Sequence, residues 1–336
     1  MKRLCLTFGS IILLCSLAVC YLWLYYHTPA AIDGQTQLIE IPQGASLRQI
    51  ATQLDEAGLI RHRWMFIMYA AWLHSGPHLQ AGEFALQATL SPAQIVDIMR
   101  RGVVVHHALT IPEGLTVHNI ASLIATKGLG KRHVVLELAH NNAFIESLGL
   151  ATPSLEGYLF PDTYHVPRGI SERDLLTLMV RTLEAHYTAE IAVKGRQLGM
   201  TRHEVLTLAS LIEKEAQVDA ERALIAAVYH NRLRRRMRLQ CDPTVIYALG
   251  EHFDGNLRKA DLKIDSPYNT YRYAGLPPGP IASPGQRSIE AAVSPASVDY
   301  FYFVATGKNG AHQFSRTLRE HNNAVRKYQL KSSRSP

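Results

Sequence analysis

The sequence predicts an α+β protein in three parts: an N-terminal transmembrane helix, a small α+β module and a larger mixed α+β domain. Three observations support this fold class. The chain opens with a long uncharged apolar run, contains two similar strand–turn–helix motifs, and then alternates amphipathic helical patterns with strand-like and Pro/Gly-rich segments. Its 336 residues suffice for two folded modules and an anchor.

The composition fits a folded body with an anionic neighbour. Hydrophobic residues make up 47% and charged residues 19% of the chain, which is ordinary for a globular protein. The net charge of +7 fits nucleic acid, anionic lipid or an anionic wall polymer. Of four cysteines, only Cys241 lies outside the N-terminal run. We therefore expect no disulfide framework and no metal site, and a nucleophilic Cys241 is less favoured than a small packing residue.

The N-terminal run predicts a single-pass membrane anchor. Lys2 and Arg3 precede an uncharged stretch from Leu4 to Tyr26, which as a helix would reach about 34 Å and cross the ~30 Å hydrocarbon core. The leading basic residues predict a cytoplasmic N-terminus and a body on the far side of the membrane. An aromatic belt would follow at the outer interface: Trp23, Tyr25 and Tyr26. We expect residues 1–26 to be a cytoplasmic stub and transmembrane helix, and residues 27–35 a linker.

Two alternatives to a retained anchor stay open. Pro29-Ala30-Ala31 is a weak signal-peptidase site, although a cleaved signal usually has an apolar core of only ~7–15 residues. Leu17 to Cys20 resembles a lipoprotein box, but Val19 stands where a small residue is normally needed. The uncleaved anchor is the favoured interpretation.

A short motif occurs twice, at residues 41–51 and 111–121. Each copy contains a strand end, a Pro-x-Gly turn and a helix N-cap with a capping-box partner at N3: Ser46 with Gln49, and Thr116 with Asn119. A further helix is bounded by Ser91 and Gly102. Residues 36–106 therefore predict strand, helix, helix, strand and helix. From the residues alone, two ordinary strand–turn–helix units are slightly favoured, and a LysM-like wall-binding module, which has a similar turn and helix, is the alternative.

The most informative helix is predicted from Thr201 to Gln217. Thr201 and Glu204 form a capping box, which gives Glu204 a structural role. Glu213 and Glu215 lie on opposite flanks of the apolar stripe. A carboxylate beside apolar neighbours is costly to ionise, so its pKa tends to rise, as a general acid requires. The alternative is that each Glu pairs with a nearby arginine, and helix geometry alone does not decide.

The C-terminal half contains further marked elements. Asp219 is expected to cap a helix that ends in a basic run, residues 232–238, which is either a solvated helix end or a groove for an anionic polymer. Asp242 is expected to cap a short helix. Residues 265–285 predict a long Pro-, Gly- and Tyr-rich loop. A hairpin spanning residues 300–315, a helix at 316–328 and a tail at 331–336 complete the chain.

Several stretches resemble the endolytic murein (peptidoglycan) transglycosylases anchored in the inner membrane. They occur in family order and cover roughly residues 37–330: Leu155–Tyr164, Ala209–Glu215, Asn231–Leu233, Met237–Gln240, Asp242–Tyr247, Tyr268–Tyr271 and Gly275–Ile281. One departure is Cys241, where the family pattern has Thr.

The resemblance implies a site and a reaction. The catalytic residue of the family is the first Glu of a Glu-Lys-Glu triplet, here Glu213. A LysM-like module would precede a catalytic domain at residues 107–330. The family cleaves the β-1,4 bond between N-acetylmuramic acid and N-acetylglucosamine, gives 1,6-anhydro ends and terminates nascent glycan elongation, without metal or cofactor. The implied location is the inner (plasma) membrane with a periplasmic body, the partners are glycan strands and cell-wall synthases, and nucleic acid is disfavoured because the body lies outside the cytoplasm.

Four residues are candidates for positioning the sugar: Tyr158, Gln240, Asp242 and Asn269. Two other functions remain open. A muramidase-type hydrolase would use Glu213 with a partner such as Asp242 or Glu156 to activate water. A non-catalytic peptidoglycan-binding scaffold for cell-wall synthases would bind strands without cutting them.

Overall fold

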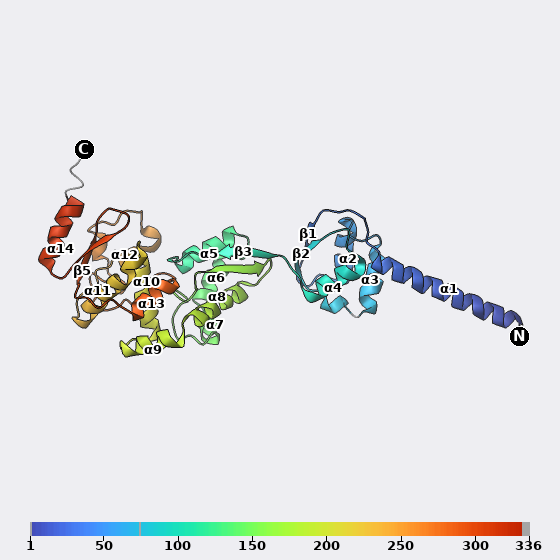
Figure 1. Ribbon diagram of the computed structural model, residues 1–336, viewed down its shortest axis with the longest axis horizontal. Helices are drawn as coiled ribbons and strands as arrows, with labels where there is room; N and C mark the ends of the chain where they lie inside the picture. Colours follow the sequence, from blue (N-terminus) through green and yellow to red (C-terminus); the bar gives the residue numbers. More distant parts are fainter. Residues whose placement is uncertain (1, 74, 331–336) are drawn as a thin grey trace, which may run out of the picture. The chain divides into compact units, whose positions relative to one another are not determined.

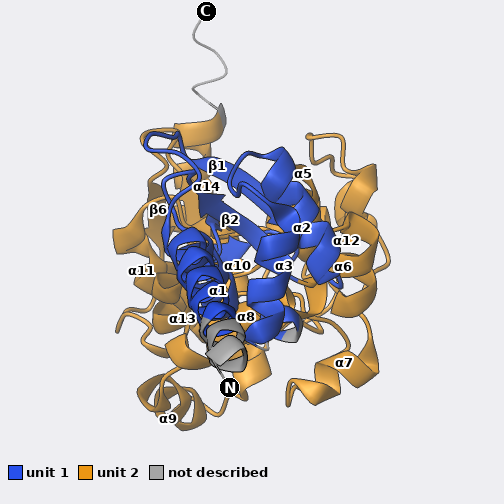
Figure 2. Cartoon of the chain, turned by 90° about the vertical axis from the view of Figure 1, so that its right-hand side faces the viewer, with its two compact units in different colours: residues 1–108, 165–170 blue, residues 109–164, 171–336 orange. Residues whose placement is uncertain are grey.

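The computed structural model describes residues 2–73 and 75–330, and it is a mixed helix and strand structure with one N-terminal apolar helix (Figure 1). At this level the predicted α+β class is confirmed. The chain divides into two compact units, residues 1–108 with 165–170 and residues 109–164 with 171–336 (Figure 2). The predicted tail, residues 331–336, lies outside the described residues.

The first unit has the predicted order of elements. Its helices and strands are α1 (Lys2–His27), β1 (Gln37–Ile41), α2 (Leu47–Glu56), α3 (Arg63–Trp72), β2 (Gly82–Leu86) and α4 (Pro92–Arg101). Strands β1 and β2 pair antiparallel, with Gln37 opposite Leu86 and Ile41 opposite Gly82. The helices and this small sheet enclose an apolar core that includes Phe66 and Phe84.

The predicted helix ends of this unit are confirmed. Ser46 with Gln49 forms a capping box before α2, and Ser91 with Gln94 forms another before α4. Gly102 ends α4 in the left-handed conformation, with φ of 65°, which glycine adopts without a Cβ penalty. The same polar side chains that marked the helices in the sequence therefore satisfy their first backbone N–H groups.

Helix α1 supports the anchor prediction in length and composition. Residues Ser10–His27 form an apolar helix long enough to cross a membrane. The predicted aromatic belt is only partly correct. Trp23 is exposed, but Tyr25 is buried to 8% exposure and its hydroxyl is hydrogen-bonded to the backbone of His62. The end of α1 is therefore attached to the folded part of its own unit.

The second unit is built mainly of helices. Its elements are α5 (Val117–Thr126), α6 (Arg132–Ala139), α7 (Asn142–Ser147), α8 (Glu172–His186), α9 (Ala189–Gln197), α10 (Arg202–Glu215), α11 (Arg222–Arg234), α12 (Asp242–Leu249), α13 (Gln286–Val293), the hairpin β5 (Tyr302–Ala305) and β6 (His312–Ser315), and α14 (Leu318–Val325). Strands β3 (His106–Thr110) and β4 (Thr163–Pro167) form a two-stranded sheet through which the chain passes from one unit to the other.

Helix α10 is the core helix of the second unit, and it contacts α11, α12 and α13. All eight residues from Val205 to Ile212 are buried, so the predicted apolar stripe was too narrow. Thr201 and Glu204 form the predicted capping box at its start. The two carboxylates of α10 outside the capping box, Glu213 and Glu215, lie in its last turn, beyond this enclosed middle.

Three predicted helix boundaries were wrong. Asp219 does not cap α11, because it lies in a 3-10 helix (Asp219–Glu221) and its carboxylate binds two arginines. Asp242 is the first residue of α12 rather than its cap, and Cys241 occupies the N-cap. The predicted helix at residues 316–328 is divided into α14 and a π-helix, Arg326–Leu330. The predicted loop at 265–285 contains no helix or strand, and the hairpin is confirmed.

Candidate active site

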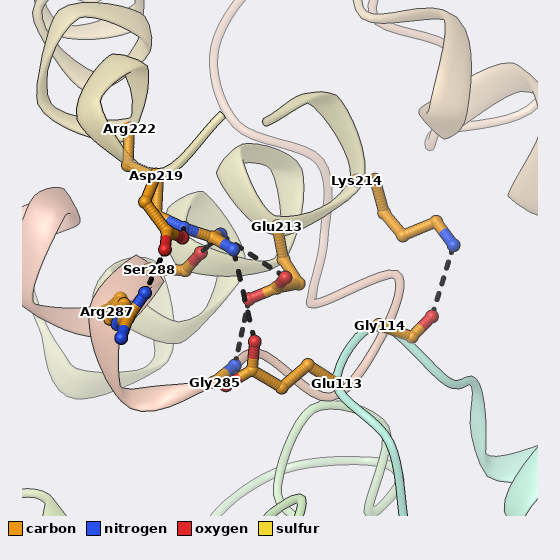
Figure 3. Close-up of polar contacts among 9 residues, drawn as sticks. All are labelled: Glu113, Gly114, Glu213, Lys214, Asp219, Arg222, Gly285, Arg287 and Ser288. Atoms are coloured by element: carbon orange, nitrogen blue, oxygen red, sulfur yellow. Dashed lines mark hydrogen bonds and ion pairs between the residues drawn. The ribbon is translucent and has the colours of Figure 1, made fainter. Parts of the chain in front are cut away.

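Glu213 lies in the last turn of α10 with a hydrogen-bond donor on each carboxylate oxygen (Figure 3). Nη1 of Arg222 donates to Oε1 at 3.2 Å, and the backbone N–H of Gly285 donates to Oε2 at 3.0 Å. The side chain is only 7% exposed. Of the two alternatives left open by the sequence, an arginine partner is therefore present at Glu213. The donor of the first contact is a charged guanidinium, which places it in the stronger class of hydrogen bonds in proteins.

Arg222, the first residue of α11, lies among three carboxylates. Besides Glu213, its Nε donates to Asp219 Oδ1 at 3.2 Å, and its Nη2 is 3.9 Å from Glu113 Oε2. Its Nη1 also donates to the hydroxyl of Ser288 in α13. The side chains of Glu113 and Asp219 are 48% and 56% exposed. The cluster therefore opens to solvent at these two residues and has Glu213 at its buried end.

The turn that carries Glu113 is fixed to this cluster by backbone contacts. Gly114 N–H donates to Ser283 O at 2.8 Å, and Ser283 N–H donates to Leu115 O at 2.8 Å. Nζ of Lys214 donates to Gly114 O at 3.1 Å. This turn is the second copy of the repeated motif, and its helix α5 has the expected capping box.

Close packing explains the glycine at position 285. A Cβ at Gly285 would lie 1.8 Å from Glu113 Oε1, so a side chain there would displace the Glu113 carboxylate. The pKa of Glu113 is raised, first by partial burial and then by the negative charge of Glu213. The carboxyl group of Glu213 therefore lies close enough for its charge to act on Glu113.

Glu215 lies only two residues from Glu213 but in different surroundings. It accepts a hydrogen bond from the hydroxyl of buried Tyr229 at 3.3 Å. Burial raises the pKa of Glu215, which is the direction expected for a carboxyl on the apolar flank. Among the described residues, Glu213 and Glu215 share no hydrogen-bond or ion-pair partner. The two flanks of α10 are therefore separate environments.

Two of the predicted sugar-positioning residues are buried. The hydroxyl of Tyr158 is 2.8 Å from His203 Nδ1, and His203 Nε2 is 2.8 Å from Pro278 O. Asn269 donates through Nδ2 to the carbonyls of Leu262 and Ile264. Tyr158 and Asn269 therefore hold the long loop in place from within the protein.

The other two predicted residues are exposed. Gln240 has a left-handed backbone, with φ of 49°, and its N–H donates to Thr270 O at 3.1 Å. Asp242 accepts a hydrogen bond from the hydroxyl of Tyr271. The structure thus brings Gln240 and Asp242 together with the segment that follows Asn269, whereas Tyr158 lies near the start of α10. Among the described contacts, none of the four binds Glu213.

Glu156, an alternative partner in a hydrolytic mechanism, is buried at the start of α5. Its two oxygens accept from Val117 N–H at 3.2 and 3.3 Å, and Tyr247 donates to it at 3.3 Å. Burial raises its pKa from 4.5 to about 7. These contacts give Glu156 a structural role as a helix-terminus ligand.

Residue patterns did not assign to this site the two partners of Glu213, Arg222 and Gly285. They also did not assign to it the other residues around Arg222: Glu113, Asp219 and Ser288. One signal was available. The two copies of the repeated motif differ at the centre of the turn, where the first has Gln43 and the second has Glu113. A carboxylate in one copy alone is a charge difference that the shared fold does not require.

Comparisons with known proteins agree with this architecture. A family model described as the YceG-like family matches residues 39–327. A Bacillus subtilis (strain 168) protein named endolytic murein transglycosylase is 37% identical over 318 residues, which cover 89% of this chain and 87% of that protein. A Streptococcus pneumoniae (strain D39) protein of the same name is 33% identical over 85% of this chain and 57% of its own length.

A solved structure agrees as well. The crystal structure of a YceG-like protein from Listeria monocytogenes is 38% identical, with a TM-score of 0.59, and the match covers 87% of this chain and 99% of that one. The family model and these relatives span both the strand–helix unit and the unit that contains Glu213. The chain belongs to the YceG-like family.

Proposed function

We propose that this protein is an endolytic murein transglycosylase that cleaves the glycan strands of peptidoglycan with Glu213 as its catalytic acid and base. Relatives with this name align over 85–89% of the chain. The observation that carries the assignment to Glu213 is its position. Its carboxylate lies at the buried end of a polar cluster whose outer members, Glu113 and Asp219, are half exposed.

The reaction needs one carboxyl group. Glu213, protonated at first, gives its proton to the glycosidic oxygen as the bond from C1 of N-acetylmuramic acid breaks. It then takes the proton of the C6 hydroxyl as that oxygen attacks C1, and the product ends in 1,6-anhydro-N-acetylmuramic acid. The attacking group belongs to the substrate, in contrast to a two-carboxylate hydrolase.

The contacts of Glu213 suit the middle of this sequence. After the first proton transfer the side chain is an anion, and Arg222 and Gly285 N–H then donate to its two oxygens. General acid–base catalysis contributes about 10²–10⁴-fold, and positioning of the sugar must supply the rest of the acceleration.

Glu113 supplies a second contact for the sugar in this proposal. No described residue donates a hydrogen bond to its carboxylate, and the nearest atom of its charged partner, Arg222 Nη2, is 3.9 Å from Oε2. Sugar hydroxyls and acetamide N–H groups can donate hydrogen bonds to these two oxygens. Gln240 and Asp242 are exposed and can extend the sugar contacts, whereas Tyr158 and Asn269, which are buried, act by holding the loop.

The first unit binds the same polymer in this proposal, as a LysM-like module at residues 36–106. Its β1-α2-α3-β2 order supports the likeness. A surface cavity of about 430 Å³ lies beside the turn between β1 and α2 and is lined by Pro42–Ala45 and by polar side chains of α2: Arg48, Gln49, Thr52 and Gln53. The amide, hydroxyl and guanidinium groups of these side chains are suited to hydrogen-bonding a sugar.

The remaining assignments follow from the sequence and the family. Residues 1–26 anchor the protein in the inner membrane, residues 27–35 are the linker, and residues 107–330 are the catalytic domain. Lys2 and Arg3 keep the N-terminus in the cytoplasm, so the body is periplasmic. There it terminates nascent strands made by cell-wall synthases, which are its expected protein partners.

Product analysis tests the function. The full-length protein in detergent is incubated with uncrosslinked glycan, and the new strand ends are identified by mass spectrometry. We expect anhydro ends, whereas hydrolysis would give ends heavier by about 18 Da, the mass of one water. Strand binding without any cleavage would instead support the scaffold function.

A further inference from the structure

Helix α3 exposes a row of large apolar side chains. Trp64, Met68 and Trp72 are 58%, 46% and 75% exposed. They are spaced four residues apart, so at about 100° per residue they form one stripe along the helix. The opposite side of α3 packs into the core of the first unit through Phe66 and Ala70. An exposed apolar face of this kind on a folded unit marks an interaction surface.

This helix is fixed to the end of α1. At the start of α3, Tyr25 Oη donates to His62 O and accepts from His62 N–H, both at 3.2 Å. Two turns later, the rings of Tyr26 and Tyr69 stack at 4.3 Å, and Tyr69 is 6.3 Å from the ring of Trp72. Figure 1 shows α3 beside the C-terminal end of α1.

The connection after α1 is held as well. Arg61 donates through Nη2 to Pro29 O at 2.9 Å and through Nε to Ala30 O at 3.3 Å. Ala31 N–H donates to Ala88 O at 3.0 Å. The stripe on α3 therefore lies where the apolar segment Ser10–His27 ends, and the chain between them is not a free tether.

The charge around the stripe matches a lipid surface. The sequence has no acidic residue between Glu56 and Glu83, and Arg61 and Arg63 are exposed at the start of α3. Asp97 of α4 lies near Tyr69, but it forms ion pairs with Arg100 and Arg101. Tryptophan prefers the headgroup level of a bilayer, and basic side chains are attracted to anionic headgroups. Continuity with a membrane-spanning helix favours lipid over sugar as the occupant of this face.

We propose that the exposed face of α3, formed by Trp64, Met68 and Trp72, lies in the headgroup region of the membrane that α1 crosses. The protein would then touch the bilayer twice, through a spanning helix and through an interfacial helix of its first unit. This contact rests on the proposed anchoring by α1, but it does not depend on which way α1 is oriented.

The three tryptophans of the chain allow a direct test, because Trp23 belongs to α1 and the other two to α3. The full-length Trp23→Phe protein is reconstituted in vesicles of phosphatidylcholine and phosphatidylglycerol, with bromine on the acyl chains near the headgroup. An interfacial helix lies roughly 5–10 Å into the headgroup and acyl boundary, so we expect about half of the emission to be lost and little quenching by aqueous iodide.

The matched control is the Trp64→Phe/Trp72→Phe protein, which reports on Trp23 alone. Quenching of Trp23 by brominated lipid with iodide-accessible α3 tryptophans would overturn the α3 contact and leave the anchor intact. Absence of quenching at Trp23 would overturn both. Protection of the α3 tryptophans by soluble N-acetylglucosamine oligomers, without quenching by brominated lipid, would identify a sugar-binding face and also overturn the proposal.

Discussion

Glu213 and Glu215 stand two residues apart on α10, and their carboxyl groups lie in different environments. Glu213 accepts from Arg222 and Gly285 beside half-exposed carboxylates. Glu215 accepts from buried Tyr229, and burial raises its pKa. A raised pKa alone therefore does not identify the catalytic group, because structural burial produces the same shift. The guanidinium of Arg222 and the half-exposed carboxylates beside it, which Glu215 lacks among its described contacts, separate the two residues.

The largest expected effect comes from removing the proton carrier. Glu213→Gln should lower the rate of anhydro-product formation by about 10²–10⁴-fold or more, because an amide neither gives nor takes the proton. Product release from purified sacculi measures the rate, and circular dichroism checks that the fold is kept. Normal product yield from this variant would remove Glu213 from the mechanism.

The second effect concerns a buried carboxyl that has no part in the chemistry. The pKa of Glu156 is about 7 in the folded protein and 4.5 when unperturbed. Because the folded-state pKa is raised, Glu156 does not reduce the free energy of unfolding below about pH 4.5. As pH rises to about 7, this free energy falls by on the order of 3 kcal/mol.

The Glu156→Gln variant has no titratable group at this position. The free energy of unfolding of the variant minus that of the parent should therefore rise by a comparable amount between about pH 5 and about pH 8. Urea unfolding of the second unit at both pH values measures the difference. A constant difference between variant and parent across this range would show that Glu156 is ionised in the folded protein throughout.

The third prediction concerns Arg222, which donates to Glu213 and Asp219 and lies beside Glu113. Arg222→Met should lower the rate by about 10²-fold, the usual loss for one donor to a transient anion. Arg222→Lys is the matched control and should recover part of this loss, because it restores the charge without the guanidinium geometry. If Met and Lys behave alike, the charge of Arg222 has no role in the reaction.

A smaller effect is expected at Glu113. Glu113→Ala should raise KM by about tenfold, with little change in kcat. About tenfold is the effect of one lost hydrogen bond to a charged group. Glu113→Gln keeps an acceptor oxygen and should lie between Ala and the parent. Glu146→Ala, at an exposed glutamate of α7, is the control and should leave cleavage of short soluble strands unchanged.

The smallest effect on activity is expected at Glu215. Glu215→Gln should change the rate by less than about threefold, since the residue contacts no group of the Glu213 cluster. The folded-state pKa of Glu215 is raised, so ionisation costs stability as pH rises. The variant should therefore gain stability over the parent with increasing pH. A rate loss as large as that of Glu213→Gln would erase the distinction between the two residues.

Local elements were predictable because their signals are local. Capping boxes such as Ser46 with Gln49, the helix stop at Gly102 and the hairpin at 300–315 each depend on a few neighbouring residues, and the structure has them all. The burial of α10 on all sides was missed because it depends on α11, α12 and α13, which periodicity within one helix does not reveal.

The site could be predicted only in part. Helix geometry left Glu213 and Glu215 equivalent, and only the family resemblance favoured Glu213. The partners Arg222 and Gly285 and the neighbouring Glu113 come from three separate segments, and no spacing rule links them. Asp219 was assigned to a helix cap because Asp is a common cap, whereas its carboxylate binds Arg222 and Arg287.

Oxygen labelling tests most directly whether a single carboxyl group, Glu213, acts with the sugar's own hydroxyl. The full-length protein cleaves uncrosslinked glycan in water enriched in oxygen-18, and the masses of the new strand ends are measured by mass spectrometry. Intramolecular attack by the C6 hydroxyl predicts ends without the label in the parent and no new ends in Glu213→Gln. Labelled ends would contradict this chemistry, because they would show that water attacks the sugar with the help of a second group.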